Sequence, residues 1–475
     1  MDAKVVRSRL LGLLGPDGLL TVSTDVEPYL IDHRRLYHGR TPAVVMPKTV
    51  EQVSKVLAFC HEHLIGVVPQ GGNTSYCGGA TPDETGEQIV LSLRRLNRIR
   101  SIDPLNWSMV AEAGCILADV QRAADAADRF FPLSLGAEGS CQIGGNLATN
   151  AGGTNVVRYG MMRDQVLGLE AVLADGRVLS TLSSLRKDNT GYDIKSLFLG
   201  SEGTLGIITA ASLKLFPKPR SSATAFVAVP DVRAAVELLA ELREESGDSV
   251  SSFELIPRIA VDLTTIHIEG VTDPLNEIYP WYVLCELTSS RFVDTLDAVL
   301  EGVLSGAMER KAVLDAALAQ NERERESFWK LRETIPEAQR LDGASIKHDV
   351  SLPIAVLPEF VERASAWVAA NVPEGRLVAY GHVGDGNLHF NLNQAPDVDS
   401  EKFLAREPDA KRAIHDLVRE FGGSFSAEHG IGRLKVAELE RYAPAAELEL
   451  MRAVKRAFDP NGILNPGKIF RVGTV

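Results

Sequence analysis

The sequence predicts an α+β protein with more than one domain. Its 475 residues exceed the length at which a single hydrophobic core usually stops growing, so we expect two or three domains. Hydrophobic residues make up 45% and charged residues 24% of the chain, as is typical of a globular protein. Strand-like and helix-like segments alternate with glycine-rich loops before residue 220, and the pattern changes after it.

The N-terminal part opens with a predicted strand, helix, strand and glycine loop within residues 41–75. Thr49 and Gln52 form a candidate capping box, and apolar residues at helical spacing follow them. Short apolar runs and a turn signal then predict the later elements of this part, which are strands at 67–69 and 107–114, a helix at 117–129, a hairpin at 165–181 that turns at Asp175-Gly176, and a helical turn, a loop and a strand within 191–219.

After residue 220 the pattern is that of an α+β unit in which strands alternate with amphipathic helices. The predicted elements are strands at 223–230, 250–257 and 281–288, and helices at 232–247, near 292–306 and at 355–371. The chain ends in a further helix at 446–460.

Charge and cysteine content restrict the class of protein. The net charge of −13 argues against a general binder of nucleic acid or anionic membranes. The five cysteines form no CxxC pair, so we expect free thiols in a reducing compartment. The first residues do not resemble a signal peptide, and no segment approaches the roughly 20 apolar residues of a membrane helix. A cytoplasmic protein is therefore expected.

Three glycine-rich loops, at 71–79, 136–153 and 200–206, are the strongest sign of a ligand. Glycine lets backbone amides approach a ligand closely. The spacing fits neither the G-x-G-x-x-G motif of a nicotinamide site nor a phosphate-binding P-loop. Because the loops carry little basic charge, we expect them to hold a pyrophosphate through backbone amides.

These loops also resemble a known family. The stretches "PQGGNTS", "EAGCIL", "GAEGSCQIGGNLATNAGG" and "LFLGSEGTLGIIT" are similar to the FAD-binding domain of the vanillyl-alcohol-oxidase-type flavoproteins. The C-terminal stretches "GHVGDGNLHFNL", "SAEHGIGRLK" and "NPGKIF" resemble the D-2-hydroxyacid dehydrogenase branch, and "KHDVSLP" resembles the D-2-hydroxyglutarate dehydrogenases. The resemblance extends over residues 40–475, with the motifs in the expected order.

The resemblance implies a two-part FAD-binding domain with an α+β cap domain and a helical C-terminal return. The corresponding ranges are 1–219 for the FAD-binding domain, 220–425 for the cap, and 426–475 for the segment that packs back on the FAD-binding domain. The residues that match the family's FAD motifs are Gln70, Gly71, Gly72, Asn73, Thr74, Ser75, Gly139, Ser140, Gly144, Asn146, Thr149, Gly153, Glu202, Gly206, Ile208 and Asn465. Many members attach FAD through a histidine in the first loop, and none is present here, so we expect non-covalent FAD.

The stretch "HVGDGNLH" predicts a pair of neighbouring histidines. If Asp385-Gly386 is a two-residue hairpin turn, His382 faces His389 across it, with Cβ atoms roughly 4.5–5.5 Å apart. Two such imidazoles can share a metal ion or can simply be structural. The resemblance favours the metal and adds Glu428 as the third ligand. This donor set suits Zn²⁺, with Mn²⁺ or Fe²⁺ as alternatives.

The resemblance also suggests how a D-2-hydroxy acid is oxidised. It implies that His429 is the base that takes the α-hydroxyl proton. Arg332 and Lys347 match positions that bind the substrate carboxylate, while a surface ion pair is the plain alternative for each. Asn391 lies on the same strand face as His389 and is expected to contact the substrate or to order a ligand. The hydroxyglutarate enzymes carry a small hydroxylated residue where this chain has Pro336, which leaves the substrate's length open.

Several functions therefore remain open. D-2-hydroxyglutarate and D-malate are the favoured substrates, and a D-lactate or glycolate dehydrogenase is the alternative. A zinc hydrolase and a binding module without catalysis are more remote. The resemblance suggests an electron-transfer flavoprotein or a quinone-linked carrier as the electron acceptor, and a homodimer is the default expectation for the assembly.

Overall fold

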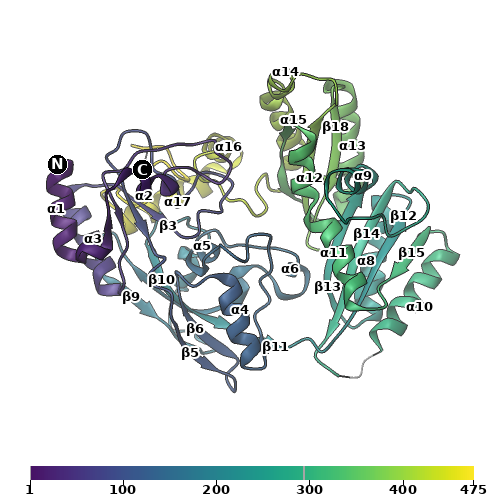
Figure 1. The fold of residues 1–475 in the computed structure, drawn as a ribbon, viewed down its shortest axis with the longest axis horizontal. Coiled ribbons are helices and arrows are strands. Elements are labelled where there is room, and N and C mark those ends of the chain that lie inside the picture. Colours follow the sequence, from purple (N-terminus) through teal and green to yellow (C-terminus); the bar gives the residue numbers. More distant parts are fainter. Residues whose placement is uncertain (1, 293–294, 475) are drawn as a thin grey trace. The chain divides into compact units, whose positions relative to one another are not determined.

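The computed structural model describes residues 2–292 and 295–474 of the chain (Figure 1). The chain divides into two compact units. Unit 1 comprises residues 1–152, 160–218 and 428–475, and unit 2 comprises residues 153–159 and 219–427. Residues 153–159 thus belong to unit 2 although both of their flanks belong to unit 1, which no sequence pattern indicated.

Unit 1 contains two main sheets. A four-stranded sheet has the order β1-β2-β4-β3, with β2, β4 and β3 parallel, and a five-stranded antiparallel sheet has the order β5-β6-β10-β8-β9. Its strands are β1 (Leu19–Leu20), β2 (Val44–Val45), β3 (Val67–Gln70), β4 (Ile89–Ser92), β5 (Ile99–Asp103), β6 (Ser108–Glu112), β7 (Arg129–Phe130), β8 (Val166–Val172), β9 (Val178–Thr181), β10 (Ile207–Lys214) and β11 (Phe216–Pro217). Its helices are α1 (Ala3–Leu14), α2 (Ser23–Val26), α3 (Val50–His63), α4 (Leu117–Ala126), α5 (Ile143–Ala148), α7 (Lys195–Phe198), α16 (Val436–Tyr442) and α17 (Ala445–Phe458).

Local sequence signals account for several of these elements. Thr49 caps α3, because its side chain accepts a hydrogen bond from the Gln52 backbone N–H at 3.3 Å. The Gln52 side chain accepts from the Lys48 N–H instead of the Thr49 N–H, so only half of the predicted capping box forms. The predicted β8–β9 hairpin is confirmed. Its turn glycine, Gly176, has a φ of +87°, which favours glycine.

Unit 2 contains an antiparallel sheet of order β13-β14-β12-β15 and a second antiparallel sheet in which β19 pairs with β16, β17 and β18. Its strands are β12 (Ser221–Val229), β13 (Val250–Pro257), β14 (Trp281–Ser289), β15 (Asp315–Leu318), β16 (Ser345–Ile346), β17 (Asp349–Ser351), β18 (Gly375–Tyr380) and β19 (Asn387–Gln394). Its helices are α6 (Val156–Tyr159), α8 (Val232–Glu245), α9 (Arg258–His267), α10 (Leu296–Glu309), α11 (Glu322–Glu333), α12 (Ile335–Asp342), α13 (Leu357–Asn371), α14 (Ser400–Leu404) and α15 (Glu407–Glu420). The helix expected near 292–306 begins at Leu296, and residues 293–294 lie outside the described residues.

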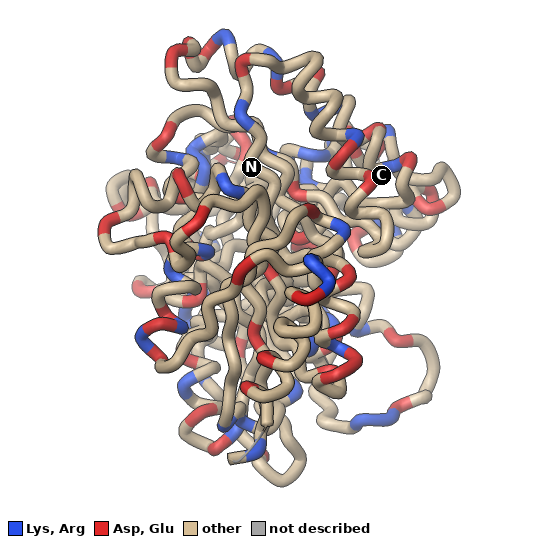
Figure 2. Tube along the Cα trace, turned by 90° about the vertical axis from the view of Figure 1, so that its right-hand side faces the viewer, with Lys and Arg blue, Asp and Glu red and all other residues tan. Residues whose placement is uncertain are grey.

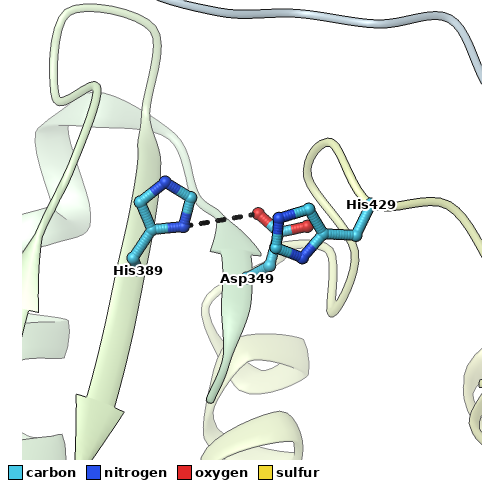
Figure 3. A group of neighbouring side chains, drawn as sticks. All are labelled: Asp349, His389 and His429. Carbon is cyan, nitrogen blue, oxygen red and sulfur yellow. Dashed lines mark ion pairs between the residues drawn. The ribbon is translucent and has the colours of Figure 1, made fainter. Parts of the chain in front are cut away.

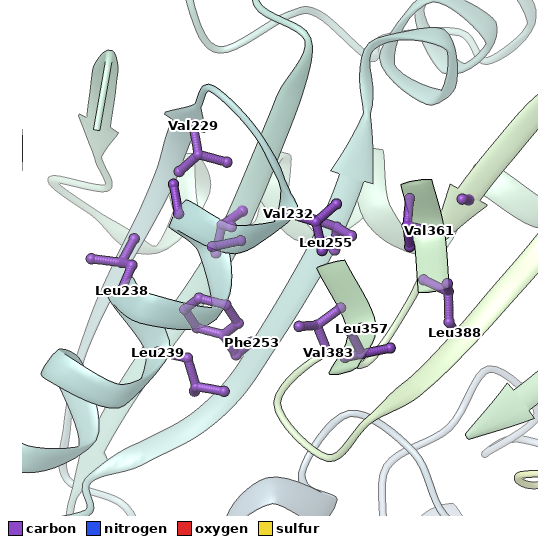
Figure 4. Packing of buried hydrophobic residues seen from close by; sticks show 14 of the residues in the cluster. Val229, Val232, Leu238, Leu239, Phe253, Leu255, Leu357, Val361, Val383 and Leu388 are labelled. Carbon is purple, nitrogen blue, oxygen red and sulfur yellow. The ribbon is translucent and has the colours of Figure 1, made fainter. Parts of the chain in front are cut away.

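One hydrophobic core joins the two sheets of unit 2 (Figure 4). It combines apolar residues of α8 and α13 with residues of β13 and β19, among them Leu238, Leu239, Leu357, Val361, Phe253, Leu255 and Leu388. The sheets also meet directly, because Leu255 in β13 and Gly381 at the end of β18 exchange two backbone hydrogen bonds of 2.9 and 3.1 Å. This junction holds the segment that follows β18 against β13.

Acidic and basic residues are interspersed along the trace of each unit (Figure 2). In the part of the chain that the structure describes, no helix is long and apolar enough to cross a lipid bilayer.

Candidate active site

The histidine hairpin has a different register from the predicted one. Strand β18 ends at Tyr380, and Tyr380, not His382, is the partner of His389 on the β18 side. Residues 381–386 form a six-residue connection in place of the predicted two-residue turn. The prediction was wrong because Gly381, with a φ of +147°, leaves the β18–β19 ladder and pairs with Leu255 instead.

The two imidazoles nevertheless come together. His382 reaches His389 from the connecting loop, and the two ring centroids lie 5.7 Å apart with an interplanar angle of 76°. His382, His389 and Glu428 each offer one ligand atom, and these atoms all lie within 4.8 Å of one another. Two imidazole nitrogens and one carboxylate oxygen form a donor set that Zn²⁺ accepts, so these residues fit a metal ion.

Glu428 follows directly on a segment that is anchored in unit 2. Ser424 pairs with Ser351 of β17, and the Ala427 N–H donates to the Asp349 carbonyl at 3.2 Å. The division between the two units falls between Ala427 and Glu428. Glu428 is therefore the residue that directly follows this anchored segment.

Asp349 is a carboxylate that sequence reasoning missed. With His389 and His429 it forms a second group whose ligand atoms lie within 4.8 Å of one another. Figure 3 shows the Asp349 carboxylate beside the His389 ring, whose Nδ1 lies 3.9 Å from Asp349 Oδ1. Asn387 donates to the same oxygen at 3.1 Å. The expected base His429 thus has the buried Asp349 carboxylate among its neighbours.

Glu254 is the second carboxylate that sequence reasoning missed, and its side chain is fully buried. One of its oxygens lies 2.6 Å from His382 Nδ1, and the other lies 2.8 Å from Arg332 Nε and 2.7 Å from Arg332 Nη2. Burial raises the pKa of Glu254, but the charges of Arg332 and His382 outweigh burial and hold the pKa at about 2. A charged residue inside the apolar strand sequence "VSSFELIP" was the available signal.

Arg332 lies in the interior, with only 6% of its surface exposed. Besides its ion pair with Glu254, its guanidinium lies 5.0 Å from the centroid of the Tyr380 ring. A surface ion pair therefore does not describe this residue. Pro336, four residues later, stands in the first turn of α12, where a missing backbone N–H costs little.

Asn391 and Lys347 lie in one part of the second sheet. The Asn391 side chain accepts from the His348 N–H at 3.1 Å and donates to Gln339 Oε1 at 3.1 Å. The first bond holds the backbone that follows Lys347, and the second joins Asn391 to Gln339 of α12. Lys347 is half-buried and lies between β16 and β17.

The predicted FAD residues of unit 1 form two loops that pack closely. A Cβ atom at Gly72 would lie 2.2 Å from the Ser140 carbonyl oxygen, so only glycine lets these loops approach. Gln142, Asn146 and Asn465 each bury a side-chain oxygen that has no hydrogen-bond partner among the described residues. A Cβ atom at Gly139 or Gly145 would meet nothing within 4 Å. Buried acceptors beside open glycines fit a cofactor that donates hydrogen bonds from its hydroxyl and ring N–H groups.

Other residues matched to FAD have protein partners in the structure. Gln70 donates to the Tyr29 and Ala80 carbonyls at 3.0 and 2.8 Å. Glu202 accepts from the Ile431 and Gly432 N–H groups, both at 2.7 Å, and burial raises its pKa. Three more of these residues donate to backbone carbonyls: Asn73 to that of Ile31, Thr149 to that of Gly145, and Asn465 to those of Gly79 and Glu202. The Ser75 hydroxyl oxygen accepts from the Cys77 N–H.

Ile208 and Gly206 lie at a packed part of unit 1, and Gly153 lies in unit 2. Ile208 is a buried residue of β10, and a Cβ atom at Gly206 would lie 2.6 Å from the Phe198 ring. Gly153 has a φ of +149° at the start of the segment 153–159.

Comparisons with known proteins agree with this architecture. Residues 41–182 match the family described as "FAD binding domain", and residues 218–469 match "FAD linked oxidases, C-terminal domain". The p-cresol methylhydroxylase crystal structure with bound substrate superposes with a TM-score of 0.76 at 18% identity, covering 99% of this chain and 97% of that chain. An alkyldihydroxyacetonephosphate synthase gives a TM-score of 0.74 at 16% identity, covering 98% and 85%. At these identities the structures show the fold, which confirms the predicted α+β class.

Relatives of higher identity are dehydrogenases. The mitochondrial D-2-hydroxyglutarate dehydrogenase of Arabidopsis thaliana is 38% identical, covering 99% of this chain and 82% of that protein. The corresponding Bos taurus enzyme is 40% identical, covering 96% and 81%. A candidate D-lactate dehydrogenase of Schizosaccharomyces pombe is 37% identical, covering 98% and 89%.

The expected cytoplasmic location is contradicted by these relatives, which are all named as mitochondrial. The expectation was wrong because net charge, free cysteines and an unremarkable N-terminus describe proteins of several compartments. The family, in contrast, follows from matches along most of the chain. The chain belongs to the FAD-linked oxidases and, within them, to the FAD-dependent D-2-hydroxyacid dehydrogenases.

Proposed function

We propose that the chain oxidises D-2-hydroxyglutarate to the 2-oxo acid, with a divalent metal held by His382, His389 and Glu428. One observation carries this proposal: the three candidate ligands group within 4.8 Å, and one of them shares Glu254 with the buried cation Arg332. His382, His389 and Glu428 would hold a metal for the α-hydroxyl end of the substrate, and Arg332 would supply a cation for the second carboxylate of a hydroxy-dicarboxylate.

Two observations support the choice of substrate. Relatives of 38–40% identity are named D-2-hydroxyglutarate dehydrogenases. Arg332 is buried and Lys347 is half-buried, so both cations can act in a partly desolvated site, where an ion pair is stronger than in water. D-malate is the shorter alternative, since Pro336 offers no hydroxyl group. D-lactate is a second candidate because one relative is a candidate D-lactate dehydrogenase.

The residues of the chain divide the chemistry among them. When bound, FAD accepts the hydride from Cα, and the metal lowers the pKa of the hydroxyl group that it binds. His382, His389 and Glu428 supply two nitrogens and an oxygen for the metal. His429 takes the hydroxyl proton at a ring nitrogen, since a neutral imidazole is a suitable base near pH 7. Arg332 and Lys347 bind the distal carboxylate, and Asn391 holds the backbone beside Lys347.

Anaerobic reduction of the bound flavin tests the proposal. D-2-hydroxyglutarate, D-malate and D-lactate are each added to the FAD-loaded protein, with and without a chelator, and the flavin absorbance is followed. We expect D-2-hydroxyglutarate to bleach the flavin and the chelator to prevent bleaching. Bleaching that survives complete metal removal would contradict the metal's role, and fastest bleaching by D-lactate would contradict the substrate.

Lys347→Ala tests the binding of the distal carboxylate. We expect its KM to rise for D-2-hydroxyglutarate and to change little for D-lactate, which has only one carboxylate. Lys330→Ala is the matched control, since the exposed Lys330 ammonium donates to the Glu269 carbonyl and has no role in the site. A Lys347→Ala variant with unchanged KM for the dicarboxylate would remove Lys347 from the proposal.

The cofactor's attachment and its electron acceptor are further parts of the proposal. We expect acid precipitation to release FAD into the supernatant, because the loop 70–75 contains no histidine. Yellow colour that stays with the precipitate would show a covalent bond. The acceptor proposed from the resemblance is an electron-transfer flavoprotein or a quinone-linked carrier. Slow reoxidation of the reduced protein in air would support it, and rapid production of hydrogen peroxide would not.

A further inference from the structure

We propose that Glu254 is a positioning residue that orients both the metal ligand His382 and the substrate-binding cation Arg332. This inference rests on the proposed function and extends it, because it joins two subsites through one side chain. Glu254 stands on β13 and is separated in sequence from Arg332 by 78 residues and from His382 by 128 residues.

The two oxygens of Glu254 have separate partners. Oε1 faces His382 Nδ1 at 2.6 Å, and Oε2 faces Arg332 Nε at 2.8 Å and Nη2 at 2.7 Å. The side chain has no exposed surface. In such surroundings a carboxylate binds its partners strongly, and neither partner can be replaced by water without cost.

The bond to Glu254 determines which nitrogen of His382 faces a metal. A carboxylate only accepts hydrogen bonds, so Nδ1 must carry the proton that it donates to Oε1. The other nitrogen, Nε2, then carries the lone pair and is the ligand atom. A carboxylate behind a ligating histidine fixes the ring orientation and makes the histidine a better ligand.

Helix α11 is attached to the sheet at two matched points. Arg325, near its start, and Trp329, one turn later, donate to Glu286 on β14, with Arg325 Nε at 2.5 Å and Trp329 Nε1 at 3.1 Å. Near its end, Arg332 donates to Glu254. Both glutamates are buried and both pair with an arginine of α11. Of these two glutamates, Glu254 is the one that binds His382. Substitution of Glu286 therefore controls for the loss of a buried glutamate that pairs with α11.

Glu254→Gln isolates the proposed role. The amide oxygen of glutamine can still accept from Arg332, but its N–H group then faces His382 Nδ1. That contact requires Nδ1 to accept, which moves the ring proton to Nε2, where it blocks metal binding. Glu286→Gln removes an equivalent buried charge from β14, the one that pairs with Arg325 of α11, without touching a histidine.

The test uses FAD-loaded protein freed of metal by chelation, which is then titrated with Zn²⁺ in competition with a chromogenic chelator. We expect Glu254→Gln to bind Zn²⁺ about 10–100-fold more weakly than the wild type and Glu286→Gln to bind it within about twofold. We also expect Glu254→Gln to raise the KM for D-2-hydroxyglutarate more than that for D-lactate. Glu254→Asp keeps the carboxylate and is expected to bind Zn²⁺ more tightly than Glu254→Gln.

Wild-type Zn²⁺ affinity in Glu254→Gln would overturn the inference. An equal loss of Zn²⁺ affinity in Glu254→Gln and Glu286→Gln would also overturn it. So would equal Zn²⁺ affinities of Glu254→Gln and Glu254→Asp. Circular dichroism and denaturant unfolding of each variant report whether the unit that carries the substitution has folded. If the wild type itself bound no Zn²⁺, the proposed metal site would fail, and that result is separate from any difference between the variants.

Discussion

His382 and His389 lie edge to face, with ring centroids 5.7 Å apart, although one ring comes from a loop and the other from strand β19. Rings at 76° to each other can direct one nitrogen each to a common point. We therefore expect His389→Ala to weaken Zn²⁺ binding by more than about 100-fold, because a ligand is lost and not merely reoriented.

Competition with a chromogenic chelator measures this change. His267→Ala is the control, since His267 belongs to the same unit and faces Asp342 at 3.4 Å. Wild-type affinity in His389→Ala would exclude His389 as a ligand.

Arg332→Lys tests the need for a planar guanidinium. Lysine keeps the charge but cannot make the forked contact with a carboxylate, so we expect the KM for D-2-hydroxyglutarate to rise about tenfold or more. Steady-state kinetics with D-lactate should change much less. Arg325→Lys makes the same substitution on the same helix, at the Glu286 end, and should leave both KM values near those of the wild type. Equal effects of the two variants would point to helix placement instead.

Gly72→Ala tests the close approach of the FAD loops. The added methyl group would lie 2.2 Å from the Ser140 carbonyl oxygen, so the backbone must shift. We expect FAD to bind about tenfold or more weakly, as measured by flavin fluorescence on titration of the apoprotein. Gly12→Ala is the control, because a Cβ atom at this position in α1 meets nothing within 4 Å. A Gly72→Ala variant with wild-type FAD affinity would show that the loops can separate at little cost.

Lys468 makes stability depend on pH. Burial and the nearby charge of Arg433 together lower its pKa from an ordinary value of 10.5 to about 7, although Asp83, Glu84 and Glu202 partly offset them. Between these pH values the unfolded chain binds the proton and the folded protein does not, so the contribution of Lys468 to the free energy of unfolding becomes more favourable as pH rises from about 7 towards 10.5.

Lys468→Met removes that dependence. We expect this variant to be more stable than the wild type at pH 7 and to lose its advantage as the pH approaches 10.5. Denaturant unfolding at several pH values measures the difference, with the exposed Lys55→Met as the control. A difference that is constant with pH would show that Lys468 keeps its ordinary pKa.

Local patterns in the sequence were sufficient for most elements. The side-chain cap at Thr49, the β8–β9 turn and helix α8 depend on residues within a few positions of one another. The turn and the helix form as predicted, and at Thr49 one of the two predicted capping-box hydrogen bonds forms. The motifs at the glycine loops and at the C-terminus were also sufficient to identify the family. These features are encoded by neighbouring residues, so they can be read without coordinates.

Tertiary structure decided the register of the histidine hairpin and the identity of the residues behind it. The predicted neighbourhood of His382 and His389 is correct, but the predicted two-residue turn is not, because Gly381 pairs with Leu255 instead. The strand sequence marks Glu254 as unusual, but it does not reveal the partners of Glu254, which lie 78 and 128 residues away. Burial gives this carboxylate its importance, and burial is a property of the packed sheets and not of any single segment.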